Sequence, residues 1–74
     1  MDQNRTLRNL GPGESALVIA IDGGRMATMR LEDLGILPGV EISVLANAAG
    51  PLLVSVGESR VIVERGIADK VRVI

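Results

Sequence analysis

The sequence contains no cysteine, histidine, phenylalanine, tyrosine or tryptophan among its 74 residues. It therefore has no imidazole base, no thiolate nucleophile, and none of the nitrogen and sulfur ligands that zinc sites prefer. The absence of cysteine also excludes disulfides, which favours a cytosolic protein over a secreted one. Without aromatic rings there is no platform for stacked bases and no groove for proline-rich peptides. These absences predict a protein that is not an enzyme and carries no metal or other cofactor.

Strong net charge and long apolar runs are missing as well. Eight basic and nine acidic residues give a net charge of −1, so the chain lacks the positive surface of a nucleic-acid-binding protein. Its longest uninterrupted apolar run, residues 16–21, is far shorter than the roughly 18 residues of a spanning helix, and residues 1–6 do not resemble a signal peptide. We expect a cytoplasmic protein that neither binds nucleic acid nor inserts into a membrane.

Aliphatic residues dominate what is present, with nine leucines, nine valines and seven isoleucines. Most of these are β-branched, which favours strands over helices. Five segments have strand patterns: 16–21, 40–44, 52–56, 60–63 and 71–74. The first is apolar throughout, which predicts a strand buried on both faces, whereas the next three alternate and predict a meander with one wet face.

One helix is predicted between the first two strands. From Arg25 to Leu34, the apolar residues Ala27, Leu31 and Leu34 recur at helical spacing. Gly35 directly after the helix suits the left-handed position of a Schellman ending, with Ile36 supplying the apolar contact. The four residues 37–40, Leu-Pro-Gly-Val, then predict a type II turn. Residues 64–70 predict one short helical turn before the last strand.

These elements predict a mainly β fold, in which a five-stranded sheet curls into a small SH3-like barrel with one α-helix between the first and second strands. A flat sheet of this length could not bury its faces, and its open edges would invite aggregation. Seventy-four residues suffice for one domain, so residues 1–74 form a single unit in which we expect only residues 1–6 to be loose.

Several patterns that could carry chemistry have simpler explanations. Residues 11–16 match a dinucleotide-binding string, but a turn precedes them and a strand follows, which is the wrong context. A serine nucleophile would need Lys70, the sole lysine, as its base, and exposed turn and strand serines are the simpler interpretation. Met26 and Met29 are expected to fill gaps in the core. Four acidic residues considered as an oxygen-ligand site lack the spacing of a ligand loop: Asp22, Glu32, Asp33 and Asp69.

The helix and its exit turn carry a more specific pattern. Residues 30–42, Arg-Leu-Glu-Asp-Leu-Gly-Ile-Leu-Pro-Gly-Val-Glu-Ile, resemble the signature R-L-x-x-L-G-I/L-x-P-G-x-x-V/I of the ferrous iron transport protein A (FeoA) family. Residues 7–16 are similar to the opening of that family, residues 22–24 to its glycine-rich loop and residues 61–73 to its closing segment. The resemblance covers residues 7–74. It departs from the family at residues 64–67, Glu-Arg-Gly-Ile, where the order of charges differs.

The resemblance implies a small cytosolic accessory or regulator of bacterial ferrous iron uptake. Its partner would be the FeoB-type membrane GTPase that transports the iron. An equally weighted interpretation is that residues 34–39 are only a helix stop and a turn that the fold requires. Otherwise, we expect partner binding at two places, namely the exit corner and the helix face that carries two arginines. The predicted partner-binding residues are Arg25, Arg30, Leu34, Gly35, Ile36, Leu37, Pro38 and Gly39.

Two alternatives come from other classes of protein. The SH3-like C-terminal domain of metal-dependent transcriptional repressors is similar in fold and in its Leu-Gly turn, but it would follow a DNA-binding region, whereas this chain starts at Met1 shortly before the first strand. A general protein-interaction module is the other alternative. The sequence also leaves weak self-association through the barrel edges open.

Overall fold

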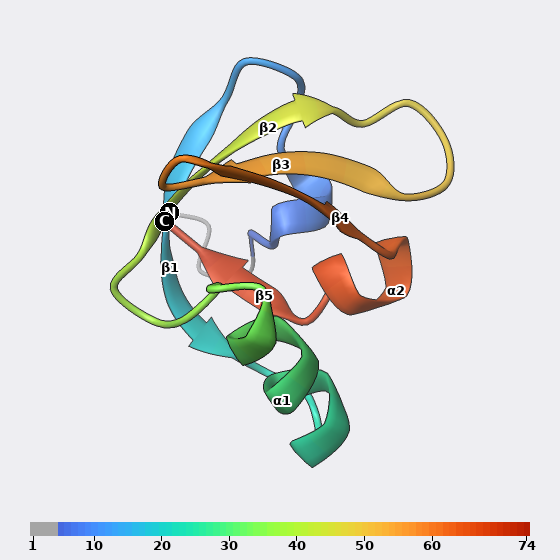
Figure 1. Cartoon of the computed structure of the whole chain (residues 1–74). Coiled ribbons are helices and arrows are strands. Elements are labelled where there is room, and N and C mark those ends of the chain that lie inside the picture. The colour runs from blue at the N-terminus through green and yellow to red at the C-terminus, as the bar shows by residue number, and fades with distance from the viewer. Residues whose placement is uncertain (1–4) are drawn as a thin grey trace.

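The computed structural model describes residues 5–74, and within them five strands form one antiparallel sheet with a 3₁₀ turn and two helices (Figure 1). The elements follow the predicted order. In sequence they are η1 (Leu7–Asn9), β1 (Ser15–Ile21), α1 (Arg25–Asp33), β2 (Glu41–Ala46), β3 (Leu52–Val56), β4 (Ser59–Val63), α2 (Arg65–Ala68) and β5 (Val71–Val73).

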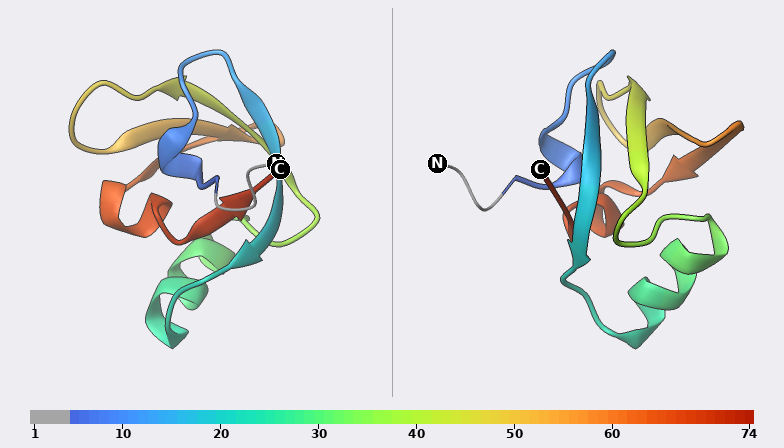
Figure 2. Two further views of the ribbon diagram at one scale, coloured as in Figure 1. Left: turned by 180° about the vertical axis from the view of Figure 1, so that it is seen from behind. Right: turned by 90° about the vertical axis from the view of Figure 1, so that its left-hand side faces the viewer.

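The sheet has the strand order β4-β3-β2-β1-β5 and curls into a small barrel (Figure 2). Strands β2, β3 and β4 form the predicted meander, and β5 returns to pair with β1. The β1–β5 pairing shifts register between Val18 and Ala20, and a bulge of this kind lets a strand bend around a barrel. Helix α1 lies outside the sheet at one end of the barrel, and α2 leads from β4 into β5.

The core is a single aliphatic cluster. It draws residues from η1, from every strand, from both helices and from the exit of α1, which the absence of aromatic side chains made necessary. The members with no exposed surface include Leu7, Leu10, Val18, Leu31, Ile36, Val44, Leu52, Val54, Ala68 and Val71.

Strand β1 corrects the expectation that both of its faces are buried. Ala16 and Val18 point into the core, whereas Leu17 is 43% and Ile19 is 40% exposed. A single-layer barrel of this size has an inside and an outside, and the outer face of β1 stays partly exposed. Because apolar residues occupy both faces of β1, its sequence does not alternate between apolar and polar residues and does not show which face is exposed.

The segment before β1 is more ordered than predicted. The main-chain N–H of Val73 donates to the carbonyl of Arg5 at 3.0 Å, and Thr6 forms a β-bridge with Arg72. Arg5 and Thr6 are therefore held against β5, which corrects the expectation that residues 1–6 are loose, while residues 1–4 lie outside the described part of the chain. The turn η1 was not predicted, and it places Leu7 in the core.

Candidate functional site

Helix α1 presents an apolar surface to solvent as well as to the core. Its buried side chains are Ala27 and Leu31, which are four residues apart and form a narrow stripe. Met26 is 84% and Met29 is 53% exposed, so the expectation that both fill the core is wrong. Residues advance by about 100° each around a helix, and both methionines therefore lie well away from the Ala27–Leu31 stripe. A nine-residue helix that touches the barrel along one stripe leaves them uncovered.

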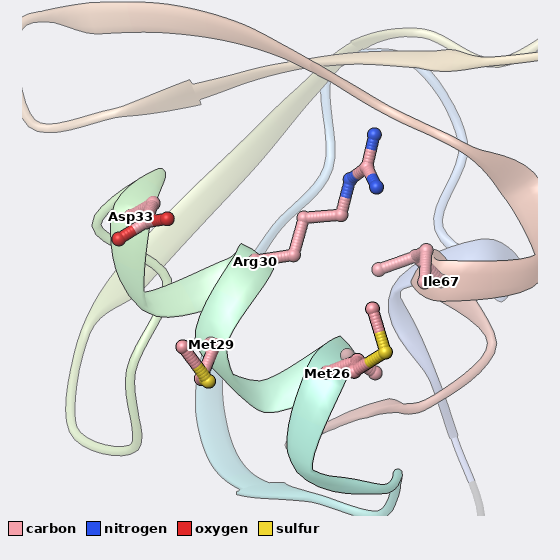
Figure 3. Close-up of a pocket in the computed structure, with 6 residues that line it drawn as sticks. Met26, Met29, Arg30, Asp33 and Ile67 are labelled. Carbon is pink, nitrogen blue, oxygen red and sulfur yellow. The ribbon is translucent and has the colours of Figure 1, made fainter.

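These methionines form one wall of an open groove. A hollow of about 530 Å³ is lined by α1 and by Ile67 of α2 (Figure 3). A smaller hollow of about 220 Å³ lies between α1 and β4, and it shares Arg30 and Ile67 with the first. We call the two together the α1–β4 groove. Its lining residues are Met26, Ala27, Met29, Arg30, Asp33, Leu34, Ile62, Val63, Glu64 and Ile67.

Arg30 occupies the middle of this groove. It lines both hollows, whereas Asp33 lines only the larger one and Glu64 only the smaller one. Its side chain extends from α1 toward the ribbon of β4 in Figure 3. Within residues 5–74 the salt bridges join Arg5 to Glu14 and Arg8 to Asp69, so Arg30 has no ion-pair partner there. The groove thus combines a mainly apolar lining with a central positive charge and two carboxylates, one in each hollow.

The exit of α1 has the predicted Schellman geometry. The N–H of Gly35 donates to the carbonyl of Glu32 and the N–H of Ile36 donates to the carbonyl of Leu31, both at 2.9 Å. Gly35 has a φ of 85°, the left-handed conformation that favours glycine.

A type II turn follows directly, as predicted. The N–H of Val40 donates to the carbonyl of Leu37 at 3.1 Å, and Gly39 has a φ of 94°. Two bonds tie this turn to β1: Gly39 N–H donates to the carbonyl of Val18 at 2.8 Å, and Val18 N–H donates to the carbonyl of Val40 at 2.9 Å. The corner is therefore fixed to the barrel.

The sequence match extends over this whole region, because a model of the FeoA domain family matches residues 5–74. The chain belongs to the FeoA domain family. The resemblance read from the helix and its exit turn is confirmed.

Known members of the FeoA family resemble this chain in sequence and structure. A protein of Methanocaldococcus jannaschii assigned as an Fe(2+) transport protein A is 38% identical over 61 residues, which cover 82% of this chain and 74% of that protein. A crystal structure of the iron uptake regulatory protein FeoA matches with a TM-score of 0.90 and 37% identity, covering 93% of each chain. FeoA from Stenotrophomonas maltophilia, solved with zinc and described as an SH3 domain protein, matches with a TM-score of 0.84 and 30% identity over 95% of this chain and 89% of that one. The predicted SH3-like fold is confirmed.

The repressor alternative shares the fold. A manganese-dependent transcriptional repressor matches with a TM-score of 0.86 at 23% identity, and the match covers 95% of this chain but 40% of the repressor. At that identity the likeness concerns architecture alone, and the FeoA family accounts for the sequence as well.

The structure divides the predicted partner-binding residues. Arg30 and the half-buried Leu34 line the groove, whereas Arg25 is exposed on the first turn of α1 outside its lining. Gly35 is half-buried, and the three turn residues that follow Ile36 are exposed. Ile36 was also predicted to bind a partner, which requires an exposed side chain, but it has no exposed surface. It sits where the Schellman motif places an apolar residue against the last turn of the helix.

Sequence reasoning missed the far side of the groove. Ile62 is 66% exposed and Ile67 is half-buried, and both line the groove with Glu64. The alternation of β4 was a usable signal, since Val61 and Val63 point inward and Ile62 must then point outward. An isoleucine on the wet face of an edge strand is a candidate contact residue.

The acidic residues considered as a metal site do not converge. No three carboxylates within residues 5–74 come close enough to hold a metal ion. As for membrane insertion, neither helix of that part of the chain has the length and apolarity to cross a bilayer.

Proposed function

We propose that this FeoA-family chain is an accessory protein of ferrous iron transport, and that it regulates a FeoB-type membrane GTPase by docking on its cytoplasmic region. Family membership supports the link to iron, as do the names of the relatives as an Fe(2+) transport protein and an iron uptake regulatory protein. Such a role places the chain in the cytoplasm and requires no catalytic group of its own.

The observation that carries docking is Arg30, which has no ion-pair partner within residues 5–74 and lies in the middle of a groove lined mainly by apolar side chains, with Asp33 in one hollow and Glu64 in the other. Exposed apolar side chains that gather in one place often mark an interaction site, and Met26, Met29 and Ile62, which all line the groove, are each more than half exposed. Arginine and methionine are both enriched at protein interfaces. Methionine adapts its shape to the surface it meets, which suits a contact with a moving partner.

The exit corner of α1 is a second exposed part of the proposed surface, outside the lining of the groove. Leu37 is 38% exposed, and it is followed by the exposed Pro38 and Gly39 on a turn that two hydrogen bonds fix to β1. A rigid turn loses little conformational entropy on binding. The proposed docking surface therefore consists of the α1–β4 groove, the corner of residues 37–39, and Arg25 at its margin.

The test is a titration of the isotope-labelled chain with the cytoplasmic GTPase region of the transporter, followed by NMR. Leu37→Asp and Arg30→Glu should each weaken binding about tenfold, because each places a negative charge where the surface is apolar or positive. Leu45→Asp is the matched control, since Leu45 is 39% exposed, like Leu37, but lies on β2 outside the proposed surface. Iron uptake by cells that carry each variant should follow the affinities.

Unchanged binding and iron uptake in both docking variants would overturn the proposal. So would an equal loss of binding with Leu45→Asp, because that result would assign the effect to surface charge in general.

A further inference from the structure

Strand β4 is an open edge of the barrel. The sheet ends with β4 on one side and β5 on the other. The outer side of β5 is covered by Arg5 and Thr6 through the hydrogen bond of Val73 and the bridge to Arg72. Strand β4 pairs with β3 alone among the strands of residues 5–74. An uncovered strand edge can pair with another strand unless charge, proline or a bulge protects it.

The register of the β3–β4 hairpin shows which groups face outward. Val56 pairs with Ser59 across a two-residue loop in which Gly57 has a φ of 59°, as in a type II′ turn. Such a turn makes Val56 and Ser59 a hydrogen-bonded pair, and hydrogen-bonded and non-bonded pairs alternate along an antiparallel ladder. The main-chain groups of Arg60 and Ile62 therefore point away from β3. Outside the strand ladders of residues 5–74, no main-chain hydrogen bond involves either residue.

This open edge faces the α1–β4 groove. The side chains of Ile62 and Val63 lie on opposite faces of β4, one exposed and one buried, yet both line the groove together with Glu64. Both residues can border one hollow because the hollow lies at the end of β4, where the open edge reaches the groove. Arg30 of α1 and Leu34, the residue that directly follows this helix, form the opposite wall.

We propose that the groove binds an extended segment of a partner protein, which adds to β4 as a sixth strand and presents a carboxylate to Arg30. The main-chain groups of Arg60 and Ile62 would bond the added strand, as in other cases of strand addition. Its apolar side chains would lie against Met29 and Ile67. The inference rests on the proposed function only for the identity of the protein that supplies the segment.

The charges along the groove specify where the carboxylate belongs. Arg30 lines both hollows and has no ion pair within the described chain, whereas Asp33 and Glu64 border one hollow each. An acidic residue in the middle of the segment meets Arg30, and acidic residues toward its ends meet carboxylates of the same charge. The segment is therefore apolar with a single central aspartate or glutamate.

The probes are two blocked peptides, acetyl-Val-Thr-Glu-Thr-Val-amide and its lysine counterpart acetyl-Val-Thr-Lys-Thr-Val-amide, in which both valines and the central charged residue share one face of the strand. The glutamate peptide should shift the amide signals of Arg60 and Ile62 and slow their hydrogen exchange, and the lysine peptide should bind about tenfold more weakly. The amide of Val61 already faces β3 and should keep its exchange rate.

Two substitutions separate the parts of the site. Arg30→Glu should reverse the preference, so that the lysine peptide binds more tightly, whereas Arg8→Glu in η1 makes the same change outside the groove and should leave the preference intact. Ile62→Pro removes an outward N–H at an exposed edge position, where proline is tolerated, and should abolish binding of both peptides. Ile62→Ala retains the N–H and should still bind.

Absence of shifts at Arg60 and Ile62 up to ~5 mM glutamate peptide, a concentration at which even millimolar affinity would be visible, would overturn the inference. Equal binding of the two peptides would do the same. Shifts of these amides with chain concentration alone would assign the edge to a second copy, which also overturns it. If the transporter GTPase region binds without any change at Arg60 and Ile62, the proposed docking stands and strand addition is rejected. If the peptide binds but the GTPase region does not, strand addition stands and the proposed docking is rejected.

Discussion

Asn47 connects three separate segments of the chain. Its amide N–H donates to the carbonyl of Arg8 at 3.0 Å and to that of Leu10 at 2.7 Å, and its Oδ1 accepts from Arg65 Nη2 at 2.7 Å. Arg65 also donates from Nε to the carbonyl of Gly50 at 3.0 Å. One partly buried amide thus joins η1 and the loop after β2 to α2, and no local sequence pattern predicts such a connection.

Asn47→Ala should lower the free energy of unfolding by about 2 kcal/mol, because it removes three hydrogen bonds and leaves the Leu10 carbonyl without this partner. Denaturant unfolding followed by circular dichroism is the measurement, since the chain has no aromatic fluorophore. A double-mutant cycle with Arg65→Ala should show a coupling of about 1 kcal/mol. The same cycle with the exposed Arg60 should show none, and equal couplings in both cycles would contradict the network.

At the scale of the elements, the sequence predicted most where local chemistry decides the backbone. The helix of residues 25–34 was predicted from its apolar spacing, and its glycine stop and the type II turn from glycines at positions whose positive φ few other residues accept; each is found. The turn η1 was missed although it carries a local cap, in which the N–H of Thr6 donates to Asn9 Oδ1 at 2.9 Å; the two bonds from Asn47 also hold it from a distance. A sequence pattern indicates the local conformation of the backbone, but it does not indicate which distant side chain will form a hydrogen bond with it.

Two glycines, one in the corner after α1 and one in α2, should respond to alanine with changes of opposite sign in the free energy of unfolding. Gly39→Ala should lower the free energy of unfolding by about 1–2 kcal/mol, because its φ of 94° is costly for a residue with a Cβ. No atom lies within 4 Å of a Cβ at that position, so the cost is conformational and not steric. Gly66 lies inside α2 without positive φ and with the same free space, so Gly66→Ala should raise the free energy of unfolding by up to about 1 kcal/mol.

The pair of glycine variants is compared by denaturant unfolding under one set of conditions. A loss of stability with both alanines would mean that packing and not backbone conformation governs these positions. A loss of partner binding by Gly39→Ala at temperatures where it remains folded would add that the shape of the corner itself is recognised.

For the whole molecule, the sequence predicted the barrel but not which apolar residues face outward. A chain of 74 residues with nine leucines, nine valines and seven isoleucines has more large aliphatic side chains than one small core can enclose. Part of the surplus lies on the outer face of β1 and on β4, at Leu17, Ile19 and Ile62, and Met26 and Met29 of α1 are exposed as well. The composition therefore predicts that some apolar side chains are exposed. The packing of α1 against the sheet brings part of this apolar surface together with Arg30 in one groove.

Helix α1 is attached to the core by fewer buried residues than the central strands are. Only Ala27 and Leu31 of this helix are buried, and its N-cap residue Gly24 provides no side-chain cap. Strands β2 and β3, by contrast, are central in the sheet and place four fully or almost fully buried residues in the core: Ile42, Val44, Leu52 and Val54. Helix α1 should therefore open locally, at a lower free energy than the sheet.

Native-state hydrogen exchange tests this difference, and the amides of α1 should exchange at least about tenfold faster than those of β2 and β3. Leu31→Ala should widen the gap, because it removes the larger of the two buried contacts of α1 and costs about 2–5 kcal/mol. Met29→Ala is the matched control, since Met29 is 53% exposed and anchors nothing in the core. If the amides of α1 and of the sheet instead exchange together in every variant, the barrel opens as one unit and α1 is no more mobile than the strands. Independent opening would instead let α1 adjust its distance from β4 to admit a partner.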